Sequence, residues 1–160
     1  VVLEPALYRL PDGVDHAEFQ FEPNVGEGVR PLARIVSGGE LSRVMLAIKT
    51  VMAERDRVPS LVFDEVDAGI GGAVAEVVGR KLKAISRSHQ VFCITHLPQI
   101  AALADAHFRI AKQESGKRTR TTILPLGPEE RVDEIARMSG GRKITDATRR
   151  HAREMLGMKA

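Results

Sequence analysis

The sequence has no tryptophan, one tyrosine and one cysteine, and it contains no apolar run long enough to cross a membrane. Aromatic residues make up only 4% of the chain against 43% hydrophobic residues, so the core must be built from aliphatic side chains. The single cysteine, Cys93, excludes an internal disulfide framework and is typical of a reducing compartment. The chain also starts without a charged and then apolar leader. We therefore expect a cytoplasmic protein with no membrane partner.

The length of 160 residues is enough for one domain with a sizeable core. The formal charge of +3 and the sequence pI of about 9.3 favour polyanionic partners only slightly. The chain begins with Val1 and Val2 and not with methionine, which is typical of a fragment or a processed product.

Two short apolar runs predict neighbouring strands of a parallel sheet. They are "SLVFDE", residues 60 to 65, and "QVFCIT", residues 90 to 95, and both have the composition of strands buried on two faces. Between them, apolar residues recur at helical spacing, at Val74, Val77, Val78, Leu82 and Ile85. The order strand, helix, strand is typical of an α/β crossover unit, so we expect an α/β fold.

The rest of the chain divides into shorter segments. Turn residues in 1–30 predict a hairpin with loops, and 34–53 holds a glycine turn followed by a helix. That helix has one apolar face, formed by Leu41, Val44, Met45, Ile48, Val51 and Met52. The strand–helix–strand region covers 60–111, and a second hairpin covers 112–127 with its turn near Ser115. Two helices are expected in 128–160, the second capped by Thr145, with Ser139 to Gly141 ending the first.

The turn "SGGE", Ser37 to Glu40, has two compatible interpretations. As a capping box, the serine hydroxyl accepts from an amide one turn on and the glutamate reaches back. As an anion site, the bare glycines allow a ligand to approach the backbone, and the amino end of the helix offers free N–H groups to a phosphate.

Acidic and imidazole side chains follow the two predicted strands. Asp64 and Glu65 end the first, at the edge where ligands of open α/β sheets bind, and His96 follows the second. Asp64 can hold Mg²⁺, Glu65 can polarise a water that attacks a phosphoryl group, and the imidazole of His96 can donate to a phosphate oxygen. A pair of solvated acids and an incidental histidine is the simpler alternative.

The order of these motifs resembles the signature motif, Walker B, D-loop and switch histidine of ABC-type ATPases. Within that superfamily, four stretches are similar to the carboxyl-terminal part of the RecN family, SMC-like ATPases of bacterial DNA repair: "PNVGEGVRPLARIVSGGELSRVMLAIK", "FDEVDAGIGG", "ITHLPQIAALADAHF" and "EIARMSGG". The resemblance runs from about Phe19 to Leu156. It implies an ABC/SMC-type ATPase head, a P-loop NTPase-like sheet flanked by helices, of which this chain is the carboxyl-terminal half.

The resemblance also implies roles for particular residues. A turn would contact the γ-phosphate of an ATP held by another head, and it is formed by Ser37, Gly38, Gly39 and Glu40. Asp64 would support Mg²⁺, Glu65 would be the catalytic base, and His96 would sense the γ-phosphate. Asp67 would help to join the two heads. The family further implies an ATP sandwich between two heads of a homodimer, long coiled coils, and recombinational repair of double-strand breaks.

One departure from the ATPase pattern is large. No G-x-x-x-x-G-K-[ST] phosphate loop occurs in the 160 residues. In SMC-like proteins that loop lies in the amino-terminal half of the same head. We therefore expect this chain to need that half as a partner, and to bind ATP poorly alone.

DNA is a further expected partner, through basic clusters. One lies at the second hairpin and contains Lys112, Lys117, Arg118 and Arg120; another lies near the end and contains Arg142, Lys143, Arg149, Arg150 and Arg153. No aromatic residues interleave with them, so an ordinary solvated basic face is the favoured interpretation. DNA binding would make the protein nucleoid-associated. A transporter ATPase subunit and a non-catalytic module for head joining or DNA docking are the alternative functions.

Overall fold

The computed structural model of the chain describes residues 2–10, 13–22, 26, 28–34, 37–53, 55, 57–115, 118–141 and 144–158. The strands are β1 (Val2–Leu10), β2 (Gly13–Glu18), β3 (Gln20–Phe21), β4 (Arg30–Pro31), β5 (Ser60–Phe63), β6 (Gln90–Cys93), β7 (Phe108–Ser115) and β8 (Arg118–Pro125). The α-helices are α1 (Gly38–Met52), α2 (Gly72–Ile85), α3 (Pro98–Ala101), α4 (Pro128–Gly140) and α5 (Asp146–Met155), and a 3₁₀ turn covers Leu32–Arg34. None of the helices in these ranges has the length and apolarity needed to span a bilayer.

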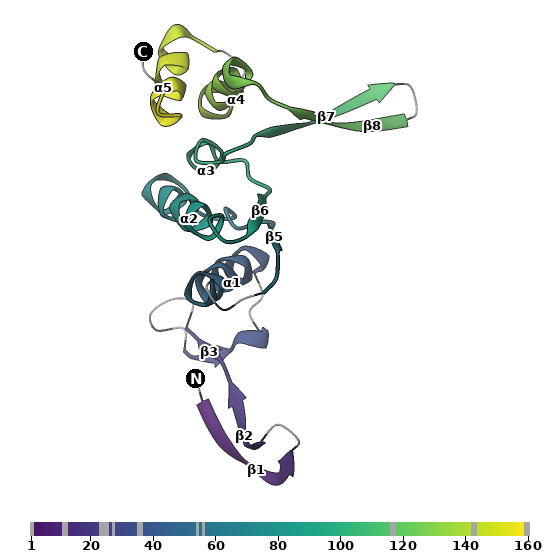
Figure 1. Ribbon diagram of the computed structural model, residues 1–160, viewed down its shortest axis with the longest axis vertical. Coiled ribbons are helices and arrows are strands. Elements are labelled where there is room, and N and C mark those ends of the chain that lie inside the picture. The colour runs from purple at the N-terminus through teal and green to yellow at the C-terminus, as the bar shows by residue number, and fades with distance from the viewer. Residues whose placement is uncertain are drawn as a thin grey trace.

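The predicted parallel pair is confirmed. Strands β5 and β6 run parallel, with Ser60 beside Gln90 and Phe63 beside Cys93, and α2 connects them. The other described strands form antiparallel pairs, β1 with β2, β3 with β4, and β7 with β8. Figure 1 shows these pieces following one another along an elongated body, from which the β7–β8 hairpin extends sideways. This hairpin begins at Phe108, earlier than the predicted 112–127.

Helix α1 begins directly after Ser37, as the sequence predicts, but the capping-box interpretation of this start is wrong. The Ser37 side chain makes no capping hydrogen bond. Of the α1 apolar side chains only Leu46, outside the predicted face, is buried; the exposed ones are Leu41, Met45, Val51 and Met52. The spacing predicted an apolar face correctly, but no described segment of the chain covers it.

Helix α2 packs its apolar face closely against α3. Its buried residues are Ala75, Val78, Gly79, Leu82 and Ile85, whereas Val74 and Val77, also predicted on the apolar face, are exposed. A Cβ on Gly79 would lie 2.8 Å from Leu103 Cδ1 and 3.3 Å from Ile100 Cα, so the two backbones approach closely only because this residue has no side chain.

The described residues cover the β5–β6 pair on one face only, so the predicted burial on two faces is wrong. Leu61 and Phe63 are buried against α1 and α2 in the main core cluster. Val62 and Phe92, on the opposite face, keep 69% and 48% of their surface exposed. Strands of this composition are typical of sheets with a layer on each side, and this chain supplies one layer.

Helices α4 and α5 form a second small core, around Val132, Ile135, Ala136 and Ala152. The predicted cap is confirmed, because the hydroxyl of Thr145 accepts a hydrogen bond from the Thr148 N–H at 3.2 Å. The predicted end of α4 is also confirmed, at Gly141, whose φ of 71° is in the left-handed region.

The accessible surface is large for the mass of the chain. It amounts to 12045 Å², whereas a compact monomer of 17.5 kDa exposes about 7,900 Å². The surplus coincides with the open apolar faces of α1, of β5–β6 and of the hairpin, where Phe108, Ile110 and Ile123 are more than half exposed. Such surface is typical of a chain that packs against a further layer of protein.

Two phenylalanines on neighbouring strands test this one-sided burial. In the isolated chain, Phe63→Ala should lower the free energy of unfolding by about 3–5 kcal/mol, because it opens a cavity in the core. Phe92→Ala, on the open face, should cost about 1 kcal/mol or less. Urea titrations followed by circular dichroism measure both, and equal losses would contradict the open face.

Candidate functional site

Three loops meet at one end of the β5–β6 pair and line a pocket of about 410 Å³ that is open to solvent. They are the turn before α1, the segment after β5 and the segment after β6. The lining residues are Ser37, Gly38, Gly39, Asp64, Glu65, Asp67, Ala68, Ile94, Thr95 and His96. The structure thus brings together the site residues that the sequence predicts here, except Glu40, which does not line the pocket. Sequence reasoning missed Ala68, Ile94 and Thr95, for which the sequence carries no separate signal.

The amino end of α1 supplies backbone donors to this pocket. The first N–H groups of a helix have no partner within the helix, and the positive end of the helix dipole lies there. No side chain caps α1, although Ser37 is correctly placed to do so. The Ser37 hydroxyl and the first amides therefore remain for an anionic ligand, which is the arrangement that binds phosphate in many proteins.

Contacts within the chain also favour glycine at both positions of the turn. A Cβ on Gly39 would lie 2.7 Å from Ala68 Cβ and 2.9 Å from the Glu65 carbonyl oxygen, and it would crowd the guanidinium of Arg43. A Cβ on Gly38 would collide with the carboxylate of Glu65. Gly39 is therefore required for α1 to approach the acid-bearing loop, whereas the exposed carboxylate of Glu65 could move away from a side chain at Gly38.

Glu65 has an unusual backbone conformation. Its φ of 56° is the one positive value found for a non-glycine residue in the described ranges. The left-handed region disfavours side chains with a Cβ, and residues held there cluster at functional sites. The Glu65 N–H donates to Asp64 Oδ1 at 2.9 Å, and both acidic side chains are exposed at the pocket.

Asp67 is buried and turned inward. Its Oδ2 accepts hydrogen bonds from Thr95 Oγ1 at 2.6 Å and from the His96 N–H at 2.8 Å, and it lies 2.9 Å from His96 Nδ1. Burial is the largest single influence and raises the pKa of Asp67, but the bonds from Thr95 and His96 and the charge of His96 together hold that pKa below its ordinary value. Asp67 is therefore an ionised group that fixes the loop after β6. The predicted contact with a second head stays a prediction.

The bond to Asp67 decides which ring nitrogen of His96 is free. Nδ1 faces the carboxylate, while the side chain as a whole is 72% exposed. When Nδ1 carries the hydrogen that Asp67 accepts, a neutral ring leaves a lone pair on Nε2. His96 can then donate from Nε2 to a phosphate oxygen only in its protonated form.

The described residues form no metal site by themselves. Within the described ranges, no three His, Cys, Asp or Glu side chains group as metal ligands would. Mg²⁺, however, is commonly held by one or two carboxylates together with substrate phosphates and water. The exposed carboxylate of Asp64 fits that shared kind of site.

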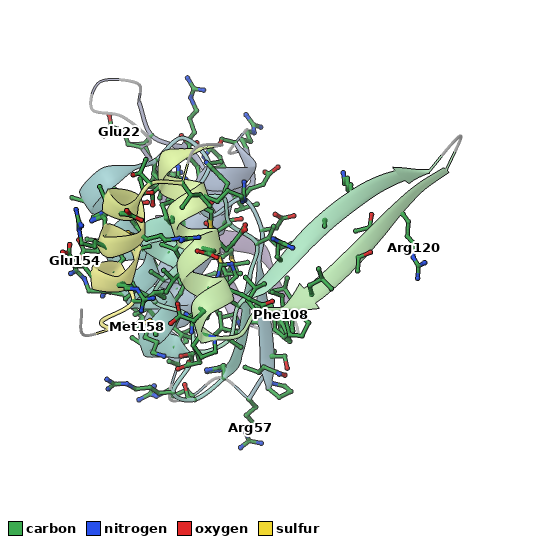
Figure 2. All side chains as sticks on the ribbon, turned by 90° about the horizontal axis from the view of Figure 1, so that it is seen from above. Glu22, Arg57, Phe108, Arg120, Glu154 and Met158 are labelled. Atoms are coloured by element: carbon green, nitrogen blue, oxygen red, sulfur yellow. The ribbon has the colours of Figure 1, made fainter. Side chains whose placement is uncertain are left out.

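The basic clusters are less concentrated than the sequence suggests. Lys112 pairs with Thr121 and Arg120 with Gln113, in adjacent rungs of the β7–β8 ladder, so these two cations leave opposite faces of the hairpin. Figure 2 shows Arg120 far out along the hairpin and Phe108 at its base. Lys117 and the side chain of Arg118 lie outside the described residues, as do Arg142 and Lys143.

Two cations of the second cluster bind α4 instead. Arg149 Nε donates to Asp133 Oδ1 at 2.9 Å, and Arg153 Nη2 donates to Glu129 Oε2 at 2.7 Å. These pairs join α5 to α4, so part of this cluster serves the packing of the two helices.

The chain is similar to proteins named DNA repair protein RecN. It is 49% identical over 147 residues to that of Halalkalibacterium halodurans, 49% over 144 residues to that of Bacillus subtilis, and 51% over 146 residues to that of Treponema pallidum. These matches cover 90 to 92% of this chain but only 25 to 26% of the relatives, so the chain spans about a quarter of their length. No protein-family model matches the chain.

Solved structures with a similar fold are SMC heads. The Smc head domain with a coiled coil and joint from Pyrococcus yayanosii aligns with a TM-score of 0.60 and 24% identity, over 82% of this chain and 23% of that one. A structure from a study of ATP-driven dimerization and DNA-stimulated activation of SMC ATPases aligns with a TM-score of 0.51 and 22% identity, over 74% of this chain and 70% of that one. The expected α/β fold of an ABC/SMC-type head is thereby confirmed.

The lowered pKa of Asp67 predicts a pH dependence of stability. A carboxyl group whose pKa is lowered by folding stabilises the protein above its unfolded pKa, near 4, and this stabilisation is lost as the pH falls through the folded pKa. The Asp67→Asn variant should have a lower urea midpoint at pH 7, and its midpoint should fall less than that of the parent chain between pH 5 and about 3. Asp15→Asn, at an exposed position of β2, is the matched control and should keep the steeper decline. Equal acid sensitivity of the Asp67→Asn variant and the parent chain would contradict the assignment.

Proposed function

We propose that this chain, a RecN-like segment with the fold of an SMC-type ATPase head, is the carboxyl-terminal half of a head that hydrolyses ATP in the complete protein. The observation that carries the proposal is the single pocket in which the uncapped start of α1, the acid pair after β5 and His96 face one another. The similarity to RecN proteins over nine-tenths of the chain supports it.

The pocket residues divide the chemistry among them. The amides at the start of α1 and the Ser37 hydroxyl bind phosphate oxygens, and His96, in its protonated form, donates to them from Nε2. Glu65 orients a water and accepts its proton, while the water oxygen bonds to the γ-phosphorus and the bond to the bridging oxygen of ADP breaks. Asp64 is the residue that would hold Mg²⁺, and that ion, when bound, neutralises charge on the phosphates.

The amino-terminal half of the same head is the first proposed partner. The phosphate loop that this sequence lacks would come from it. The open faces of α1 and of β5–β6, and the surplus of exposed surface, support a partner that adds a further layer to the head.

A second head is the next proposed partner, in a homodimer with ATP between the two copies. The turn Ser37 to Gly39 of one head would then contact the γ-phosphate of the nucleotide held by the other, and Asp67 would help to join them. In the described structure the turn and the acid pair line one pocket of one chain. In the sandwich, the turn of each head would contact the nucleotide that the acid pair of the other head faces. ATP-driven dimerization of SMC ATPases, the subject of one similar structure, supports this arrangement.

DNA is the remaining proposed partner, with a role in recombinational repair of double-strand breaks and a place in the cytoplasm at the nucleoid. The name shared by the relatives supports the repair role. The hairpin, through Lys112 and Arg120, is the proposed contact, and since these side chains leave opposite faces, each would meet a different part of a duplex. The relatives reported above are repair proteins, so they do not favour the transporter alternative.

The isolated chain should bind ATP weakly, because the loop that normally holds the β- and γ-phosphates is absent from it. Isothermal titration with ATP and Mg²⁺ should give a dissociation constant above about 1 mM, the range of non-specific contacts. The complete protein, titrated in the same buffer, is the control. Tight binding by the isolated chain would contradict the split head.

In the complete protein, Glu65→Gln should leave ATP binding within about twofold and lower the turnover number by at least 100-fold, because an amide cannot accept the proton of the attacking water. Steady-state phosphate release and nucleotide titration measure the two quantities. Glu76→Gln, on the exposed face of α2 and outside the pocket, is the matched control and should keep full turnover. Unchanged turnover of the Glu65→Gln variant would remove Glu65 from the catalytic role.

A further inference from the structure

The first turns of α1 hold the acid-bearing loop by its backbone carbonyl groups. Ser42 Oγ donates to the Asp64 carbonyl oxygen at 2.7 Å. Arg43 Nη1 donates to the Ala68 carbonyl oxygen at 2.7 Å and, more weakly, to that of Val66 at 3.4 Å. Three carbonyl groups of one short loop are thus bound by two neighbouring side chains of a helix that precedes it in the sequence by about twenty residues.

The bond from Ser42 acts directly on the conformation of Glu65. The carbonyl of Asp64 and the N–H of Glu65 belong to the same peptide group, and φ of Glu65 is the rotation about the bond that leaves this group. Ser42 fixes the oxygen of the peptide group, and the carboxylate of Asp64 fixes its N–H at 2.9 Å. The peptide plane is therefore held at both ends, which sets one side of the left-handed backbone at Glu65.

Arg43 fixes the other side of Glu65. The loop turns immediately after it, with the Ala68 N–H donating to the Glu65 carbonyl oxygen at 3.0 Å. The guanidinium of Arg43 binds the carbonyl oxygens of Val66 and Ala68, so the turn cannot open without losing these bonds. A Cβ on Gly39 would lie 3.1 Å from Arg43 Nη1, so the absence of a side chain at Gly39 leaves the guanidinium its room.

A left-handed conformation of a glutamate costs free energy and persists only where its surroundings determine it. We propose that Ser42 and Arg43 are positioning residues, which hold the backbone of Glu65 in this conformation so that its carboxylate faces the pocket. The proposal rests on the proposed function of Glu65 as the base for ATP hydrolysis. Neither side chain lines the pocket, so each acts through the loop and not on the nucleotide.

A purely structural role would have different consequences. Residues that only stabilise the fold lower the unfolding temperature, and their loss affects ATP binding and turnover together. Residues that position a general base change the turnover number while the Michaelis constant stays nearly constant, because the base acts only in the transition state. Their effect also disappears when the base itself is replaced.

The test uses the complete protein and measures steady-state and single-turnover ATP hydrolysis, ATP binding and thermal unfolding. Ser42→Ala and Arg43→Met should each lower the turnover number about tenfold with the Michaelis constant within about twofold, since a displacement of a catalytic group by less than 1 Å has effects of this order. Arg43→Lys, which keeps one donor, should recover part of the loss. Arg80→Met is the matched control, because Arg80 pairs with Glu76 at 2.6 Å on the exposed face of α2, and it should have no effect.

The same substitutions are then made in the Glu65→Gln background, where each should change the remaining single-turnover rate by less than about twofold. An undiminished tenfold loss in that background, or a full turnover number for both single variants, would overturn the proposal. If Arg43→Met destabilises the protein, Ser42→Ala still tests the proposal, because it removes only one hydroxyl group. The two proposals fail separately: normal turnover of Glu65→Gln contradicts the function of the base, whereas a slow Glu65→Gln with normal Ser42 and Arg43 variants contradicts only the positioning.

Discussion

The contact between the start of α1 and the loop after β5 is the constraint on which the site depends. Gly39 brings the helix against the Glu65 carbonyl oxygen, and Ser42 and Arg43 then bind three carbonyl groups of the loop. This contact sets the backbone of Glu65 and aims the uncapped end of α1 at the same pocket. The turn before α1 and the acid pair therefore form one unit, although about twenty-five residues separate them in the sequence.

A second unit joins the loops after β5 and β6. The buried carboxylate of Asp67 binds Thr95 and His96, so the position of the imidazole depends on the loop that carries the acids. Around these two units the chain builds only part of a core. The inner faces of α1, α2 and β5–β6 meet around Leu46, Phe63 and Val78, while the opposite faces stay open. A well-defined site on an incomplete core agrees with the proposal that the chain is one half of a divided head.

Local features of this fold could be predicted from the sequence, and long-range features could not. The parallel pair, the start of α1, the Thr145 cap and the end of α4 at Gly141 follow from short patterns, and the structure confirms them. The grouping of Asp64, Glu65 and His96 followed from strand ends that meet at one edge of the sheet, whereas the place of Ser37 in the same pocket did not. The predicted burial of both β5–β6 faces was wrong, because a pattern shows that a face is apolar but not which segment covers it. The φ of Glu65 and the inward turn of Asp67 depend on hydrogen bonds with residues more than twenty positions away, so no local pattern carries them.

The parallel pairing of β5 and β6 has a consequence for how this chain behaves on its own. Within the described residues each of these strands pairs only with the other, so each has an outer edge of backbone groups that can accept another strand. Val62 and Phe92 are exposed on the same two strands. A strand of a second molecule could therefore pair with either edge and cover these side chains. In the proposed divided head, pairing with the second half would therefore compete with aggregation, and a higher concentration of unassembled chains would lower the yield.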